Sequence, residues 1–199
     1  MLRCDVLNMG HRNIVANYAH KMGHAWGFHH EHQNPVWWSN YWSGEARDSY
    51  FFGEGSFFCE RLEDYAKVVA DIDSMVMMTP EDKTGLKRDI CRHRKIAGDW
   101  NFVGGLNWLP VTHGVQWQKK KEPDWNSLMI YPSSSGSIDG STGKDAAIIL
   151  KKPNGDVIKP ALKPSSLDIE GLRKMYQAPR STLGSFSSER AASFSTSSS

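Results

Sequence analysis

The stretch HKMGHAWGFHH, residues 20–30, decides how this 199-residue chain is interpreted. His20 and His24 stand four positions apart, and on a helix this spacing places both imidazoles on one face. Gly27 follows three residues after the second histidine, where a helix can end in a left-handed turn. The chain can then swing back and deliver His30 as a third ligand. Three neutral imidazoles leave one position on a zinc ion open for water, which is the pattern of a catalytic zinc site.

The sequence around these histidines predicts a helix over residues 13–28. Histidines at helical spacing can also be ordinary polar residues on a half-buried face, but the third histidine after the glycine favours metal binding. A rival pair, His29 with His32, has a usable i, i+3 spacing but no third partner nearby. We therefore expect one zinc ion per chain, held by the three histidines above. The apolar residues that follow the helical period are Ile14, Val15, Tyr18, Ala19, Met22, Ala25 and Trp26.

The rest of the chain predicts further helices joined by long irregular segments. Apolar periodicity favours helices over Glu60–Ile72, over Asp82–Ala97 and over Leu167–Gln177. The segment Val36–Phe58 is dense in aromatic residues and is expected to be loop and short strand. Its rings either close over the core or form a shelf that binds sugars or peptides, and the first reading is favoured. The turn sequence Pro153-Asn154-Gly155 predicts a small hairpin between the flanking apolar residues.

Composition indicates a globular protein and argues against nucleic-acid and membrane partners. Hydrophobic residues make up 39% of the chain and charged residues 23%, and the formal net charge is only +2. The longest purely apolar run, residues 146–150, is far shorter than the roughly 20 residues that cross a bilayer. The first ten residues lack the apolar core of a signal peptide. Nine serines among residues 180–199 predict a disordered tail, with the domain boundary at residues 178 and 179.

The three cysteines permit at most one internal disulfide. Cys4, Cys59 and Cys91 have no CxxC spacing, so they predict neither a thiolate metal site nor a redox motif. An odd number of cysteines is unusual for a secreted protein, and it fits a chain whose fourth cysteine lies in missing sequence.

Three stretches of the sequence resemble those of the astacin-like branch of the metzincin zinc peptidases. The string H-x-x-x-H-x-x-G-x-x-H over residues 20–30 matches the metzincin zinc motif at every position but the second, and it continues into EHQNP at residues 31–35. The string NSLMIYP at residues 126–132 resembles the methionine-containing turn of the same branch. Residues 168–176, DIEGLRKMY, resemble its closing helix.

The resemblance covers roughly Arg3 to Tyr176 and implies an α+β, metzincin-like zincin fold for a domain over residues 1–178. It includes the zinc helix, irregular loops, the methionine turn and the C-terminal helix of the lower lobe, whereas the upper sheet lobe is largely missing. It implies that Met129 packs as an apolar base under the imidazoles. Tyr131 would either ligate zinc or hydrogen-bond the oxyanion. Each residue, seen alone, would be an ordinary buried side chain. The family also implies secretion and a peptide or protein substrate.

The sequence departs from the family at Lys21, directly after the first zinc histidine. In these peptidases a glutamate there takes a proton from zinc-bound water. An ammonium has no lone pair to accept a proton, so we expect hydrolysis to be lost or reduced by roughly 100- to 10,000-fold. Glu31, in the loop after the third histidine, has no assigned role. The chain is therefore a zinc metalloendopeptidase-type domain with impaired activity, or a non-catalytic zinc- and peptide-binding pseudopeptidase. A metal-free interaction protein is the third hypothesis.

Overall fold

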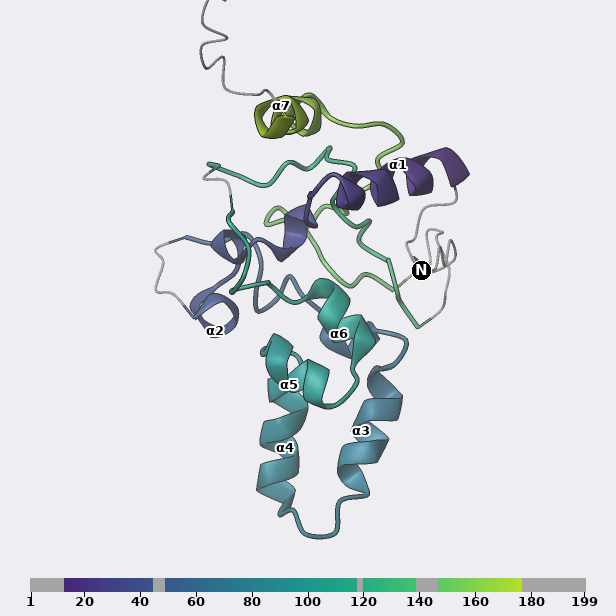
Figure 1. Cartoon of the computed structure of the whole chain (residues 1–199). Helices are drawn as coiled ribbons and strands as arrows, with labels where there is room; N and C mark the ends of the chain where they lie inside the picture. Colours follow the sequence, from purple (N-terminus) through teal and green to yellow (C-terminus); the bar gives the residue numbers. More distant parts are fainter. Residues whose placement is uncertain (1–12, 45–48, 118–119, 139–146, 177–199) are drawn as a thin grey trace, which may run out of the picture.

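The computed structural model describes residues 13–44, 49–117, 120–138 and 147–176, and in this part of the chain regular structure is helical (Figure 1). The Ser-rich segment 179–199 lies outside the described residues. Backbone pairing in the described part is limited to isolated bridges such as the antiparallel one between Phe57 and Leu150, and no strand forms there. The α+β, metzincin-like class therefore stays a prediction.

The regular elements are seven helices and three short 3-10 turns in the described part of the chain. The helices are α1 (Ile14–Ala25), α2 (Asn40–Ser43), α3 (Tyr65–Asp73), α4 (Pro80–Asp89), α5 (Arg94–Asp99), α6 (Val103–Trp108) and α7 (Ser166–Tyr176), and the short 3-10 turns are η1 (Glu31–Gln33), η2 (Pro35–Trp37) and η3 (Cys59–Arg61).

Helix α1 has defined signals at both ends. The Asn13 side chain accepts a hydrogen bond from the backbone N–H of Ala16 at 3.0 Å and caps the first turn. At the other end Gly27 takes the left-handed conformation, with φ of 93°. The N–H of Phe28 donates to the carbonyl of Gly23, and this bond with the glycine turn forms a Schellman motif. The predicted glycine turn is confirmed, and the helix ends at Ala25, three residues earlier than expected.

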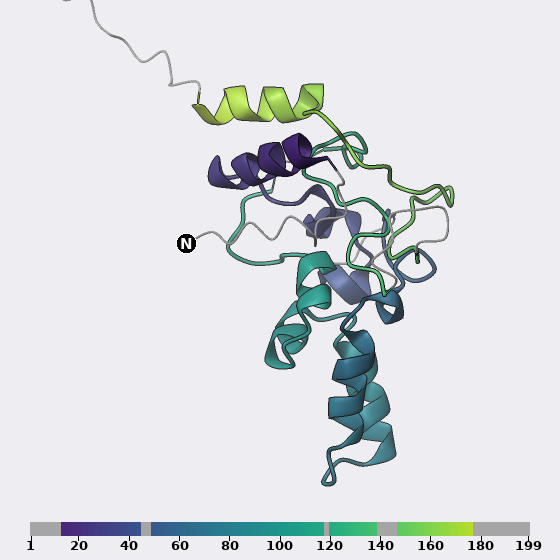
Figure 2. The same ribbon diagram turned by 90° about the vertical axis from the view of Figure 1, so that its right-hand side faces the viewer.

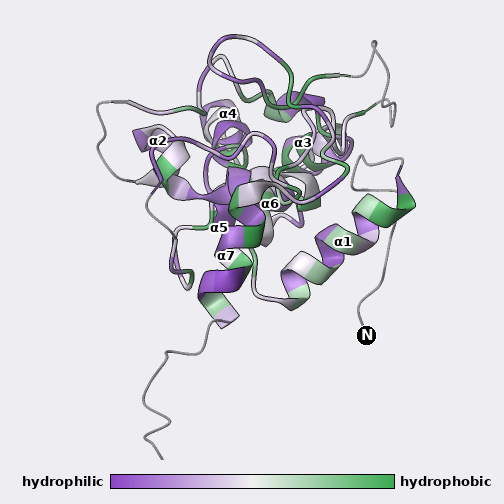
Figure 3. Cartoon of the chain, turned by 90° about the horizontal axis from the view of Figure 1, so that it is seen from above, coloured by the Kyte–Doolittle hydropathy of each residue, from purple (hydrophilic) through white to green (hydrophobic). Residues whose placement is uncertain are grey.

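Helices α1 and α7 lie side by side on one side of the molecule (Figures 1 and 2). Seen from above, both carry a mixture of apolar and polar residues along their length (Figure 3). The Phe28 ring lies against Gly171 of α7, where an added Cβ would approach it to 3.2 Å. The Tyr176 hydroxyl donates to the carbonyl of Trp26 at 3.2 Å. The C-terminal helix thus contacts the turn that ends α1, the helix that carries two of the predicted zinc ligands.

Aromatic side chains from the segment after η1 fill the core. Trp37, Trp38 and Phe52 are at most 1% exposed, and the backbones of Trp38 and Phe52 form a parallel bridge. The Trp38 ring centroid lies 5.3 Å from that of Phe57 in an edge-on arrangement. The expectation that these rings close over the core is confirmed for this set, although Tyr41 and Tyr50 remain exposed.

Two expected elements differ in the structure. The helix predicted over Asp82–Ala97 is two helices, α4 and α5, because His93 has an extended backbone and begins α5. The residues between them are held at the core, where Ile90 is fully buried and Cys91 is tied to Cys59. The helix predicted over Glu60–Ile72 begins later, at Tyr65, after the short turn η3. The small hairpin is confirmed as one antiparallel bridge between Lys151 and Val157.

The disulfide between Cys59 and Cys91 joins η3 to the segment after α4. It lies at the base of a hairpin formed by α3 and α4, which extends from the rest of the molecule (Figures 1 and 2). Cys4, the remaining cysteine, lies outside the described residues. Among the described helices, none has the length and apolar character that a membrane crossing requires.

Candidate metal centre

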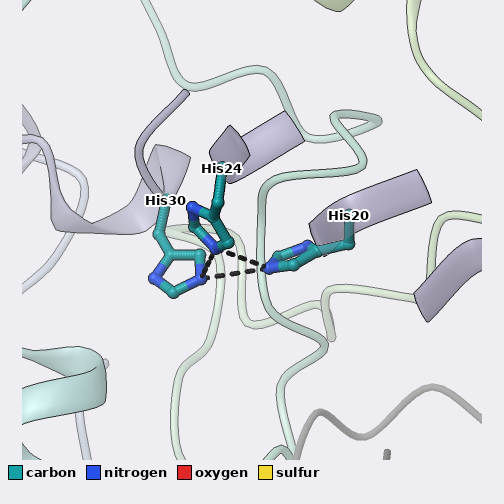
Figure 4. Close-up of side chains that lie close together, drawn as sticks. All are labelled: His20, His24 and His30. Carbon is teal, nitrogen blue, oxygen red and sulfur yellow. Dashed lines mark hydrogen bonds between the residues drawn. The ribbon is translucent and has the colours of Figure 1, made fainter. Parts of the chain in front are cut away.

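The three predicted zinc ligands converge on one point (Figure 4). The Nε2 atoms of His20 and His24 are 3.1 Å apart, those of His20 and His30 are 3.1 Å apart, and those of His24 and His30 are 3.0 Å apart. Two of these residues come from α1 and the third from the loop after the Gly27 turn, as the spacing predicted. Among the described residues, they form the group of histidine, cysteine and acidic side chains that is placed to hold a metal ion.

Hydrogen bonds on the far side of each ring fix the direction of its lone pair. His20 Nδ1 lies 2.7 Å from the carbonyl of Leu128, and His24 Nδ1 lies 2.9 Å from the carbonyl of Phe28. His30 Nδ1 lies 3.0 Å from Oε1 of Gln33. A carbonyl oxygen only accepts, so each Nδ1 carries the proton and each neutral ring presents the lone pair of Nε2 to the centre. Metal-binding histidines in proteins are oriented by the same kind of outer bond.

Burial favours the neutral, metal-binding form of His24 and His30. Burial is the largest cause that lowers the pKa of His24, and the nearby Lys21 ammonium lowers it further. Burial also lowers the pKa of His30 well below its usual value, with neighbouring histidines as a further cause. A metal ligand must be deprotonated, so these shifts favour the form of the two imidazoles that binds zinc.

The nitrogen set fits a zinc ion. Three unprotonated Nε2 atoms cannot hydrogen-bond one another, since none has a proton to donate. Nitrogens that share a tetrahedral zinc at about 2.0–2.1 Å lie roughly 3.3 Å apart, a few tenths of an ångström more than the separations in this structure. Imidazole is also a ligand type that zinc prefers. The residues present therefore suit a zinc ion that keeps one position for water.

Met129 is buried and packs against α1 between the two histidines of that helix. Its exposed fraction is 3%, and its Sδ would lie 2.5 Å from a Cβ placed on Gly23. The loop of the third ligand is tied to this turn, because the N–H of Glu31 donates to the carbonyl of Met129 at 3.0 Å. The structure thus brings the methionine turn and the histidine helix into direct contact.

Tyr131 lies beside the histidines. Its ring centroid is 4.3 Å from that of His30 and 5.9 Å from that of His20. Burial raises the pKa of Tyr131 to about 12, so its hydroxyl stays protonated at neutral pH. A protonated phenol next to the ligands can donate a hydrogen bond to a negative oxygen.

Lys21 follows His20 on α1 and is half-buried. It forms no ion pair with a carboxylate in the described part of the chain, and its charge acts on His24. The side chain at the family's glutamate position is thus a cation close to the ligands.

Two residues with structural roles at the centre were not predicted. His32 is fully buried, its Nε2 donates to the carbonyl of Asn107 at 3.0 Å, and burial lowers its pKa to about 3. Gln33 accepts from His30 and donates through its amide to the carbonyls of Leu106 and Asn107, both at 3.0 Å. A glutamine three residues after a ligand on a tight turn is the signal that would have indicated this orienting role.

The remaining sequence candidates lie apart from the centre. The rival pair is not assembled, since His29 is exposed, whereas His32 is buried and bonds to the carbonyl of Asn107. Glu31 pairs with Lys120, with 2.9 Å between Oε2 and Nζ, and its other oxygen accepts from the N–H of Asp124 at 3.1 Å. Glu31 therefore holds the segment before the methionine turn.

Comparison with known proteins gives no family to which the chain can be assigned. No protein-family model, no curated protein and no solved structure matches it.

Proposed function

We propose that this chain is a zinc-binding domain of the metallopeptidase type in which hydrolysis is impaired because Lys21 occupies the general-base position. A zinc ion at such a site supplies a water of lowered pKa and polarises a peptide carbonyl. His20, His24 and His30 would hold the ion, and the protonated Tyr131 hydroxyl would donate to the negatively charged oxygen of the substrate. The partner on this proposal is a peptide or a protein.

One observation carries the proposal. Three Nε2 lone pairs face each other at 3.0–3.1 Å, while every Nδ1 proton is committed to an oxygen on the other side of its ring. Lone pairs at this separation repel one another, and a cation at their centre removes the repulsion. An ordinary polar helix face does not require this arrangement of outer bonds.

Metal analysis of the purified protein tests the zinc site. We expect one zinc per chain in the unmutated protein and none in His20→Ala or His24→Ala. His29→Ala is the matched control, because it removes an exposed histidine of the same loop and should leave the zinc in place. Equal zinc content in all four proteins, or no zinc in any of them after growth with ample metal, would refute the site.

Activity assays separate the two readings of the function. Lys21→Glu supplies a carboxylate where the general base is missing, and general acid–base catalysis contributes roughly 100- to 10,000-fold. We expect Lys21→Glu to raise the cleavage of casein or a fluorogenic peptide by a factor in that range. Lys21→Gln is the control, since it removes the positive charge without supplying a base. Cleavage by the unmutated chain at a rate typical of enzymes would show that Lys21 does not impair hydrolysis.

The second candidate is a non-catalytic module that binds zinc and peptides, and the half-buried cation at Lys21 favours it. An unmutated chain that binds one zinc and a peptide but does not cleave the peptide would fit this candidate. Loss of peptide binding on removal of zinc would place the peptide at the metal.

The Cys59–Cys91 disulfide supports a secreted protein. Disulfides form and persist in oxidising compartments and are rare in the cytosol. Recovery of the protein from the culture medium of cells that express the full transcript tests this point, and retention inside the cell would contradict it.

A further inference from the structure

An open groove of about 570 Å³ lies away from the histidines, along the segment between the small hairpin and α7. This volume is within the range of pockets that hold small ligands. Trp125 and Asn126, where the methionine turn begins, form one wall, and the other walls come from residues 152–165. Pro160 and Pro164 line it and restrict the backbone there.

The groove carries an excess of positive charge. Lys152, Lys159 and Lys163 line it, and Asp156 is the acidic residue among its lining residues. The Asp156 carboxylate accepts a hydrogen bond from the side-chain amide of Asn154 at 2.8 Å. The three ammonium groups therefore exceed the single carboxylate in a small volume.

These three lysines differ from the lysines of the exposed helix faces. Lys67, Lys95 and Lys174 each pair with a carboxylate four residues away, at 2.6–2.7 Å. None of the lysines of the groove forms an ion pair with a described carboxylate. Their charges are thus available to a ligand.

The wall of the groove combines aromatic and apolar surface with this charge. The Lys152 ammonium lies 5.2 Å from the centroid of the Trp125 ring, within cation–π distance. The Trp125 ring is held in place by edge-on contacts with Phe51 and Phe52. A planar ring beside several cations suits a ligand that has both an apolar face and several negative groups.

We propose that this groove binds a sulfated saccharide. Lysines act as separate point charges, whereas arginine, which is absent from the lining residues, recognises a single carboxylate or phosphate through a planar fork. Clusters of basic residues on a surface bind nucleic acid or heparin, and the net charge of only +2 argues against nucleic acid. An extended acidic peptide would gain from an open strand edge, and the described part of the chain has no strand to offer one. The C–H face of a pyranose ring can lie on Trp125 while its sulfates meet the lysines.

The test is a titration of the full chain with a heparin tetrasaccharide at low ionic strength. The triple variant Lys152→Gln, Lys159→Gln, Lys163→Gln should weaken binding about tenfold or more, if each exposed contact contributes the typical energy of a surface ion pair. Binding should also weaken as salt rises, because exposed charges are screened. Circular dichroism and thermal melting check that the variant is folded.

The matched control removes the same charge elsewhere. The variant Lys67→Gln, Lys95→Gln, Lys174→Gln also lowers the net charge by three and should change the affinity less than twofold. A desulfated tetrasaccharide and a polyglutamate peptide serve as comparison ligands, and both should bind at least tenfold more weakly than the sulfated probe. The proposal is overturned if the sulfated probe does not bind, if both triple variants weaken it equally, or if either comparison ligand binds as tightly.

Discussion

The Asp168 carboxylate accepts a hydrogen bond from the backbone N–H of Leu128 at 2.8 Å. The carbonyl of the same Leu128 accepts from Nδ1 of His20, so one peptide segment connects the start of α7 to a predicted zinc ligand. Asp168 also accepts from the Ser127 hydroxyl at 2.7 Å and from the N–H of Ser165 at 2.9 Å. One carboxylate thus caps a helix and holds the methionine turn.

Asp168→Ala should therefore lower both stability and zinc affinity. Hydrogen bonds to a charged group contribute about 1.5–3 kcal/mol each, and because the lost bonds are not additive we expect a total cost of about 2–4 kcal/mol. Denaturant unfolding measures the stability, and competition with a chelating dye measures the affinity. Glu170→Ala is the control on the same helix, since that exposed residue pairs with Lys174 in solvent and its removal should leave stability and zinc affinity essentially unchanged.

Gln33→Met should weaken zinc binding by about 10- to 100-fold, the usual effect of removing a residue that orients a metal ligand. The variant keeps the volume of the side chain but loses the acceptor for His30 and the amide donor to Leu106 and Asn107. Chelator competition gives the change in affinity. Gln116→Met, at an exposed position, is the control, and an equal change in the two variants would contradict the orienting role.

Gly23→Ala should destabilise the protein by about 1–3 kcal/mol, because the added Cβ would lie 2.5 Å from Sδ of Met129 in a packed region. Combining it with Met129→Ala should cost less than the sum of the two single changes, since the truncated side chain leaves room. Gly85→Ala is the matched control within α4, where the nearest atom to an added Cβ is 4.0 Å away. Removing this glycine should stabilise α4 by up to about 1 kcal/mol. Thermal melting of the four variants measures these changes in stability, and equal effects of Gly23→Ala and Gly85→Ala would contradict the prediction.

Reduction of the Cys59–Cys91 disulfide should destabilise the domain by roughly 3–4 kcal/mol, given the 32-residue separation between the cysteines. The measurement is the loss of melting temperature when dithiothreitol is added. In the double variant Cys59→Ala, Cys91→Ala the reductant should have no further effect. An unchanged melting temperature of the unmutated protein in dithiothreitol would contradict this stabilising role.

Local signals in the sequence predicted the parts of the site that are close together along the chain. The i, i+4 spacing of His20 and His24 and the left-handed turn at Gly27 are properties of one helix and its end, so the arrangement of the ligands follows from them. The position of His30 follows from the same turn. The family resemblance, the fold class, the activity and the metal itself stay predictions.

Contacts between segments far apart in the sequence could not be predicted from local sequence patterns. Nothing near Asp168 indicates that its carboxylate reaches Leu128, and nothing near Gln33 indicates the carbonyls that it meets on α6. The predicted helix over Asp82–Ala97 failed for the same reason, because the disulfide and the burial of Ile90 override a weak apolar period. Tertiary packing, rather than helix propensity, decides such boundaries.

The link from His20 through Leu128 to Asp168 also bears on how the molecule is assembled during synthesis. His20 and Leu128 are 108 residues apart, and Leu128 and Asp168 are a further 40 apart. A ribosome releases the chain from its N-terminal end, so His20 emerges long before Asp168, whose carboxylate holds Leu128 in place. The outer bond of His20 can form only after Leu128 has left the exit tunnel, and the bond that holds Leu128 forms only after the segment of α7 has followed.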